Sequence, residues 1–280
     1  MNRAVTRSDG EVIDLVIARS DGLDEAAFRR LRASLPVSRR ERADRYRRKA
    51  DRDASVVVFS LLQYLWRRRV GGPLPDVVRG ERGKPRFRGV DGWHFNLSHD
   101  ASVCVCALSP VPVGVDVQSR VPFDDRLFET IAAPGERHLR GELLRADDLS
   151  PLWTRKEAVV KRSGRGLSTP LGEVDTVAAT DVLTAADRSG FLLSISAEGL
   201  REDQPASGLR VRYLRPGPEP GGWSEDRDHP PLFGGPSGSD GRQRAGEATP
   251  DRRRTGPDAV RRPGTPGRQP SARSRTRQVL

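Results

Sequence analysis

The sequence predicts an α+β fold in two halves, residues 1–112 and 113–215, followed by a disordered tail over residues 216–280. Apolar runs typical of strands and helices come in the order strand, helices, strands, helices, strands, and they lie before about residue 215. The remainder, Pro216–Leu280, holds 11 of the 22 prolines, 12 arginines and only six large apolar residues. Such a composition buries too little apolar surface to offset the entropy of ordering the chain.

The N-terminal half begins with a strand and continues with helices. Val12–Ala18 is rich in β-branched residues and predicts a strand. Asp21–Leu35 has apolar residues at three- and four-residue spacing and ends before Pro36, which predicts a short amphipathic helix. A second helix follows in the charged region after Arg39, and the main helix of this half covers residues 51–69, before two glycines and a proline.

The remaining elements join the first half to the second. Alternating or continuous apolar runs predict strands, and longer periodic segments predict helices. The expected strands are 93–97, 102–108, 113–117, 191–197 and 209–214, and the expected helices are 134–146 and 150–163. The residues show no internal repeat, so any similarity between the halves would be structural only.

The charge and the cysteines limit the class of protein. The formal net charge is +11, of which +4 falls on the tail and +7 on the rest. A basic surface suits an anionic partner such as nucleic acid, a phosphorylated small molecule or an acidic protein, and an ordinary solvated surface is the alternative. No apolar run is long enough for a membrane span and no signal peptide is visible, so we expect a cytoplasmic protein. Cys104 and Cys106 share one face of a strand, where we expect buried, reduced thiols.

Lysine is rare in this chain, with four lysines against 45 arginines, yet Lys156 and Lys161 flank Glu157 on one predicted helix. An exposed ion pair between Glu157 and Lys161, one helical turn apart, is the plain structural interpretation. A compact ammonium group differs from a guanidinium in the way it approaches a single phosphate oxygen. The presence of two lysines in this segment therefore favours a functional role for them. Lys84, between Gly83 and Pro85, is a third lysine that a bend can present to a ligand.

Two strand segments carry further candidates. In VGVDVQ (113–118), Asp116 and Gln118 share a face with Gly114, which leaves room for an oxygen-ligated ion, although an ordinary half-exposed strand has the same pattern. In WHFNLSHD (93–100), Ser98 faces away from the apolar side and His99 lies at the strand end. Adjacent residues on a strand point apart and no G-x-S-x-G motif is present, so acyl-hydrolase chemistry is not expected.

These candidates together favour phosphoryl transfer. Asp116 and Glu157 suit a magnesium ion, Lys84 and Lys161 suit phosphate oxygens, and Arg39 and Arg42 add positive charge at a helix start. The chain has no G-x-x-x-x-G-K-[ST] loop, which argues against an ordinary nucleoside triphosphatase.

Three ordered motifs, FNLSH (95–99), GVDVQ (114–118) and WTRKEAVVKRSGRGLS (153–168), resemble the signature of the surfactin-synthetase type of 4′-phosphopantetheinyl transferase. The resemblance extends from about Arg39 to Ser168. It implies a pseudo-dimer of two α+β halves, with coenzyme A and Mg²⁺ between them. It also implies transfer of the phosphopantetheine arm to a serine of an acidic acyl or peptidyl carrier protein, with release of 3′,5′-ADP, by a monomer that needs no membrane.

The resemblance also implies roles for individual residues. Asp116, Gln118 and Glu157 would hold Mg²⁺, with Glu157 as the base for the serine proton and Lys161 at the phosphate under attack. The residues expected to bind coenzyme A are Arg39, Arg42, Ser55, Lys84, Ser98 and His99. Glu136 matches an acid near the site, without a defined role.

Three positions depart from the family pattern. Gln118 stands where many members have Glu, Ala54 stands where an arginine is expected, and the chain after Leu214 lacks the closing apolar strand.

Two other functions stay open. One is a nucleic-acid-binding protein that uses its basic surface and tail, although aromatic residues are sparse among the arginines. The other is a degenerate relative that binds coenzyme A or a carrier protein without transferring anything.

Overall fold

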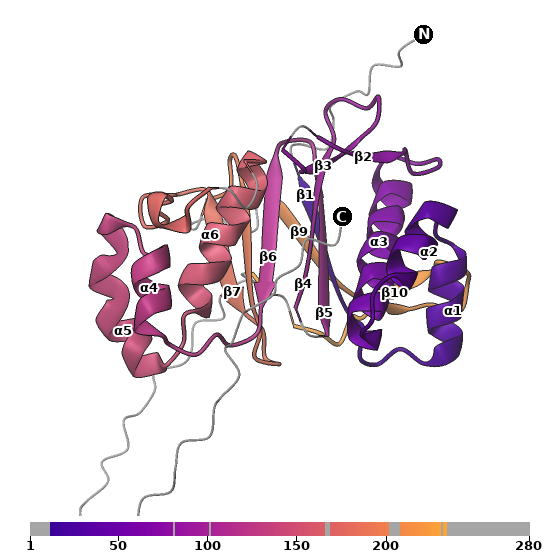
Figure 1. Ribbon diagram of the computed structural model, residues 1–280. Coiled ribbons are helices and arrows are strands. Elements are labelled where there is room, and N and C mark those ends of the chain that lie inside the picture. The colour runs from indigo at the N-terminus through magenta and orange to yellow at the C-terminus, as the bar shows by residue number, and fades with distance from the viewer. Residues whose placement is uncertain are drawn as a thin grey trace, which may run out of the picture. The chain divides into compact units, whose positions relative to one another are not determined.

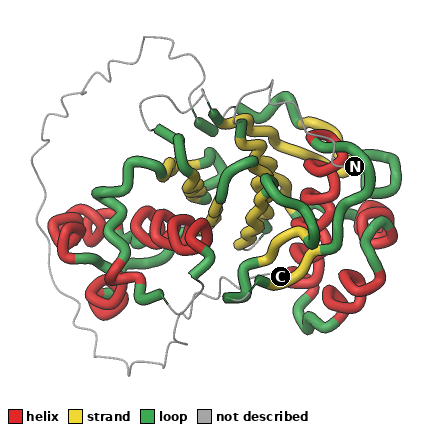
Figure 2. Tube along the Cα trace, turned by 90° about the horizontal axis from the view of Figure 1, so that it is seen from above, coloured by secondary structure: helices red, strands yellow, loops and turns green. Residues whose placement is uncertain are grey.

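The computed structural model describes residues 12–80, 82–100, 102–165, 169–201, 208–230 and 232–233. All of them belong to one compact unit, and the fold is of the mixed α+β kind that the sequence predicts. Figure 2 shows the helices in two groups, with the strands between them. No helix in this described part of the chain is long and apolar enough to cross a membrane.

The larger sheet has five strands in the order β10-β9-β1-β5-β4 (Figure 1). β1 pairs antiparallel with β5 and parallel with β9, while β4 pairs antiparallel with β5 and β10 with β9. The strands span β1 (Ile13–Arg19), β4 (His94–Asp100), β5 (Val103–Ser109), β9 (Leu209–Pro216) and β10 (Trp223–Glu225).

Three helices cover one face of this sheet: α1 (Glu25–Ala33), α2 (Val37–Asp44) and α3 (Lys49–Arg69). The Asp24 side chain accepts a hydrogen bond from the Ala27 N–H and so caps α1. The apolar middle of α3 packs on the strand residues whose side chains alternate to that face, including Phe95, Cys104 and Cys106. Both cysteines are free and buried, as predicted, and burial raises the pKa of Cys104 to about 12.

The smaller sheet has the order β6-β8-β7 and faces the opposite side of the larger sheet. Valines and leucines of the two sheets form one apolar layer between them. Helix α6 (Ser150–Ser163) packs on the outer face of this second sheet, and α4 (Asp125–Ile131) and α5 (Arg140–Ala146) form a third cluster with its start. The strands are β6 (Val113–Gln118), β7 (Val182–Ala186) and β8 (Leu192–Ala197).

The long helices and strands that we expected are present, but the sequence did not predict several short elements. The structure adds α4, the strand β7 and a small hairpin of β2 (Val77–Arg79) and β3 (Pro85–Phe87). The expected helix at 134–146 is a 3₁₀ turn, η1 (Pro134–Leu139), that continues into α5, and a second 3₁₀ turn, η2, covers Leu171–Glu173. β9, which we placed in the C-terminal half, pairs with β1 instead, so the larger sheet unites both ends of the described chain.

The described structure extends beyond residue 216, where the sequence predicts that the tail begins. β10 pairs with β9, and Asp226 N–H donates to the Tyr213 carbonyl over 2.8 Å. Trp223 belongs to the core between the helices and the larger sheet, whereas Leu232 and Phe233 pack against the layer between the sheets. The expectation that no strand follows Leu214 is therefore wrong: β10 pairs with β9, because Trp223 anchors this segment in the core. Most of the predicted tail lies outside the described residues.

We predict that a chain ending at residue 216 is less stable than a chain ending at residue 235. The shorter chain loses the packing of Trp223, which alone corresponds to about 3–5 kcal/mol. Urea unfolding of the two proteins, followed by circular dichroism, measures the difference. Identical unfolding free energies would show that residues 217–235 do not contribute to the core.

Candidate active site

The two sheets meet along β4 and β6, which belong to different sheets and are joined by side chains. Alternate residues of β4 turn a polar side chain toward β6, and each accepts a hydrogen bond from a backbone N–H. The three bonds run from Val115 N to Asn96 Oδ1 (2.8 Å), from Val117 N to Ser98 Oγ (3.4 Å) and from Ser119 N to Asp100 Oδ2 (2.5 Å). We call these three bonds the side-chain ladder. They join β4 and β6 in place of the backbone hydrogen bonds that pair strands within one sheet.

Asp116 lies at the centre of this seam and is fully buried. Its Oδ1 accepts from Lys161 Nζ over 2.5 Å and from Ser98 Oγ over 3.0 Å, and Lys161 also donates to Ser98 Oγ over 3.2 Å. Its Oδ2 is equally buried and has no hydrogen-bond partner among the described residues. Burial raises the pKa of Asp116, and the adjacent Lys161 opposes this effect. Oδ1 of Asp116 is thus held by two hydrogen bonds, and Oδ2 remains available to a ligand.

Glu157 precedes Lys161 by one turn of α6 and is 5% exposed. Its carboxylate has no hydrogen-bond donor among the described residues. Burial is the main cause that raises the pKa of Glu157, and the negative charge of Asp116 raises it further, which shows that the two carboxylates share one electrostatic environment.

Gly114 determines how closely β6 and α6 approach each other. A Cβ atom there would lie 2.0 Å from the Ala158 carbonyl oxygen and 2.4 Å from the Arg162 nitrogen, so only glycine fits. The expectation that Gly114 leaves room for an ion is therefore wrong, because the backbone of α6 fills that space. The close contact brings Asp116, two residues along the same face, beside Lys161.

The donor set of this site suits a hard cation. Among the described residues, no group of three His, Cys, Asp or Glu side chains gathers as metal ligands would. Asp116 and Glu157 supply two carboxylates, and a third oxygen would have to come from an amide such as Gln118. The buried, unpartnered Oδ2 of Asp116 fits a cation that prefers oxygen ligands.

A second group of predicted residues lies on α2 and α3. The Arg39 guanidinium stands 4.3 Å above the ring of Phe59, and Ser55 is one turn before Phe59 on the same helix face. Burial lowers the pKa of Arg39 to about 10, with further contributions from the positive charges of Arg42 and Arg79. The buried Nε of Arg42 has no acceptor in the part of the chain that the structure describes. Clustered arginines with an unpaired donor favour an anion such as phosphate. Ala54, in contrast, is buried in the core, so an arginine at this position would not face the cluster.

Lys84 and His99 have more enclosed surroundings than the sequence suggests. Lys84 Nζ donates to the carbonyls of Val113 (3.1 Å) and Arg162 (2.8 Å), which ties the β2–β3 hairpin to β6 and α6. Burial lowers the pKa of Lys84 to about 8. His99 is 8% exposed, and its pKa is lowered first by burial; Asp51, Lys161 and Asp100 are the charges that act on it.

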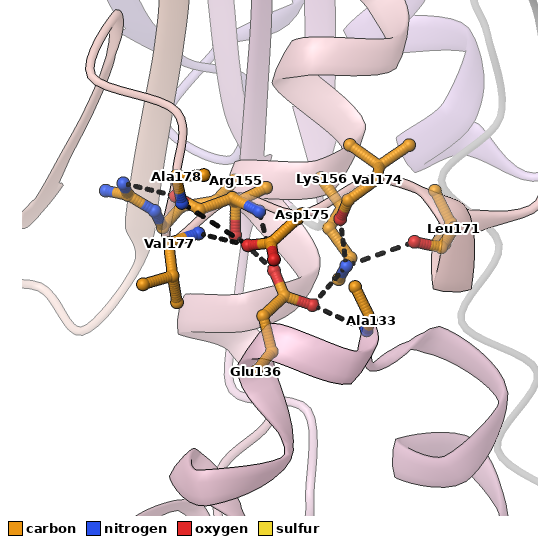
Figure 3. A network of polar contacts seen from close by, with 10 residues as sticks. Ala133, Glu136, Arg155, Lys156, Leu171, Val174, Asp175, Val177 and Ala178 are labelled. Atoms are coloured by element: carbon orange, nitrogen blue, oxygen red, sulfur yellow. Dashed lines mark hydrogen bonds and ion pairs between the residues drawn. The ribbon is translucent and has the colours of Figure 1, made fainter.

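Lys156 has a structural role, contrary to the interpretation that both lysines flanking Glu157 line a phosphate pocket. Its ammonium pairs with Glu136 and donates to the carbonyls of Leu171 and Val174, and neither charged side chain is exposed (Figure 3). Glu136 in turn accepts from the N–H groups of Ala133 and Thr176. This network, rather than a ligand, accounts for the open role of Glu136 and holds the segment after α6.

Sequence reasoning assigned no role to Asn96, Asp100 or Arg79. Asn96 and Asp100 are in fact visible in FNLSHD as polar residues at alternating positions with Ser98, a pattern that predicts a polar strand face. Arg79 gave no signal, because it is one of 45 arginines in the chain.

We predict that Lys156→Met destabilises the protein by about 3–5 kcal/mol, because it leaves the buried charge of Glu136 without a partner. The double variant Lys156→Met/Glu136→Gln should be more stable than Lys156→Met alone, since it buries no unpaired charge. Chemical unfolding of the wild type, both single variants and the double variant gives the coupling. Strictly additive effects would contradict a direct interaction.

The low pKa of His99 predicts a loss of stability in acid. Between the lowered pKa of the folded state and the ordinary value of 6.5, the unfolded chain binds more protons, so stability falls as the pH decreases through this window. His99→Asn removes this contribution. The free energy of unfolding of the variant relative to the wild type should therefore rise from about pH 8 to about pH 5.5. A difference that does not change with pH would contradict the burial of a neutral imidazole.

The region that contains Asp116, Glu157 and Lys161 is similar to known proteins. Residues 112–197 match the model of the 4′-phosphopantetheinyl transferase superfamily. The chain is 27% identical over 147 residues to a 4′-phosphopantetheinyl transferase of Bacillus subtilis, covering 51% of this chain and 66% of that protein. It is 26% identical over 157 residues to 4′-phosphopantetheinyl transferase Sfp of Bacillus subtilis (strain 168), covering 53% and 69%, respectively.

A relative from a different organism matches a shorter stretch more closely. The chain is 37% identical over 103 residues to 4′-phosphopantetheinyl transferase AcpT of Salmonella typhimurium, which covers 34% of this chain and 53% of the relative. The matches thus span between about half and about two thirds of the length of these relatives. The matched region 112–197 contains Asp116, Glu157 and Lys161, and over this region the chain is similar to the 4′-phosphopantetheinyl transferase superfamily, including the relative Sfp.

Proposed function

We propose that this protein transfers the 4′-phosphopantetheine arm of coenzyme A to a serine of an acyl or peptidyl carrier protein, in a Mg²⁺-dependent reaction that releases 3′,5′-ADP. One observation carries the proposal. Asp116, at the centre of the seam between β4 and β6, lies beside Glu157 and Lys161 of α6, with its Oδ2 unpartnered among the described residues, inside the region that matches the transferase superfamily.

The positive groups suit coenzyme A, which carries a pyrophosphate and a 3′-phosphate. Arg39 and Arg42 supply clustered guanidinium groups for the 3′-phosphate, with Ser55 on the adjacent helix face. Lys84, Ser98 and His99 are the proposed contacts along the remaining phosphates. The net charge of +11 also suits an acidic carrier protein, because opposite charge speeds the encounter of the two proteins.

The cation would be held by Asp116 and Glu157, with Gln118 as a further oxygen ligand, and would neutralise charge on the pyrophosphate. Glu157 takes the proton from the serine hydroxyl, whose oxygen forms a bond to the β-phosphorus of the pyrophosphate. The bond from this phosphorus to the bridging oxygen breaks, and 3′,5′-ADP leaves with the electron pair. Lys161, held by Asp116 and Ser98, stabilises the negative charge that develops on the phosphate. The buried surroundings that raise the pKa of Glu157 make it a stronger base.

Mass spectrometry tests this function directly. The full chain is incubated with coenzyme A, MgCl₂ and apo forms of acyl and peptidyl carrier proteins. A mass gain on the carrier equal to one phosphopantetheine arm, abolished by EDTA and by mutation of the carrier serine, is the expected result. Binding of coenzyme A without transfer to any carrier would support a degenerate relative instead.

We predict that Glu157→Gln lowers the transfer rate by about 100-fold or more while coenzyme A binding changes little, because proton removal is lost and the phosphate contacts remain. Glu25→Gln, an exposed substitution on α1, is the matched control and should leave both quantities unchanged. Transfer rates come from the mass assay, and coenzyme A affinity comes from calorimetry. Wild-type turnover by Glu157→Gln would exclude Glu157 as the base.

A further inference from the structure

Asp100 is the last member of the side-chain ladder, and it contacts a residue of the proposed cation site. Its Oδ2 accepts from the backbone N–H of Ser119 over 2.5 Å and from Nε2 of Gln118 over 3.2 Å. Gln118 is 5% exposed, so its amide is held in a confined space. None of the motifs assigns a role to Asp100.

The chemistry of this contact fixes the orientation of the amide. A carboxylate accepts hydrogen bonds and donates none, so the nitrogen of Gln118 must be the atom that faces Asp100. The amide oxygen is therefore turned away from Asp100. Gln118 and Asp116 are two residues apart on β6 and share one face of the strand. An oxygen presented on that face is a ligand for a hard cation, whereas an amide nitrogen is not.

The charge of Asp100 acts on the same site. Gln118 contributes an oxygen but no negative charge to a cation. Burial is the main cause that raises the pKa of Asp116, and the carboxylate of Asp100 is close enough to raise it further, so its field extends into the seam. A negative charge just behind a neutral ligand strengthens the attraction for a cation and polarises the amide oxygen toward it.

We propose that Asp100 is a positioning residue of the cation site: it turns the Gln118 oxygen toward the cation and supplies, from β4, the negative charge that Gln118 lacks. This inference rests on the proposed function, since it requires that the seam binds a divalent cation. It predicts that Asp100 and Gln118 act as a pair, in which the carboxylate and the amide can exchange places.

Mn²⁺ binding, measured by electron paramagnetic resonance on the full chain without coenzyme A, tests the first part. Asp100→Asn keeps one oxygen that can accept from both Ser119 and Gln118, as Oδ2 does, but removes the negative charge. We expect the dissociation constant to rise about 10- to 100-fold. Asp76→Asn removes an equally negative but exposed side chain and serves as the charge-matched control, with an unchanged constant expected. Equal affinities of Asp100→Asn and the wild type would overturn the inference.

The exchanged variant Asp100→Asn/Gln118→Glu tests the second part. The amide introduced on β4 can donate to the carboxylate introduced on β6, so the donor, the acceptor and the net charge are all kept while their strands are reversed. We expect most of the wild-type Mn²⁺ affinity to return, because the exchanged pair again supplies one negative charge and one donated hydrogen bond. An exchanged variant as weak as Asp100→Asn alone would overturn the pairing.

The same measurements separate this inference from the proposed function. If the wild type itself does not bind Mn²⁺, with or without coenzyme A, the proposed cation site fails and this inference fails with it. Wild-type binding that Asp100→Asn leaves intact removes only the inference.

Discussion

The side-chain ladder between β4 and β6 is the constraint on which the site depends. The two sheets share one apolar layer but meet along strands that belong to different sheets, and Asn96, Ser98 and Asp100 bridge these strands. Each of these side chains has capacity for more than one hydrogen bond. Ser98 and Asp100 use the surplus to hold Asp116 and Gln118, respectively. The same bonds that join the sheets therefore orient the groups that carry the proposed chemistry, so a shift of one strand would misplace both.

Helix α6 contributes to the site from the other side, and its two lysines have different roles. The backbone contact at Gly114 sets the depth of the helix, and the buried Lys156–Glu136 pair fixes the segment that follows it. Lys161, five residues later, points to the seam and reaches Asp116. A buried ion pair contributes little net stability compared with an apolar contact, but breaking it is costly. Such a pair suits a helix that must keep one rotation and one depth.

Much of the fold was predictable because its long elements have clear periodicity, as in α3 and in β4 to β6. The short elements β2, β3, β7 and β10 were not, since three to five residues carry too little pattern to separate a strand from a loop. Within the candidate site, the motifs predicted Asp116, Glu157 and Lys161 as a group, and the structure places these three residues beside one another. The sequence could not predict that Lys156 has a structural role while Lys161 lies in the candidate site. Which partner each lysine contacts depends on the packing of α4 and η1 against α6. Gly114 was misjudged for the same reason: the sequence shows an absent side chain but not which neighbour fills the space.

The four lysines share one property: each ammonium group forms a hydrogen bond or an ion pair with oxygen. Lys49 pairs with Asp53, Lys84 with two carbonyls, Lys156 with Glu136 and Lys161 with Asp116. Among these side chains only Lys49 is largely exposed, at 64%. A reagent that modifies amines would therefore label Lys49 in the folded protein, while Lys156 and Lys161 would react only as their surroundings open. In a chain with so few amines, the order in which they become modified would report which part of the structure loosens first.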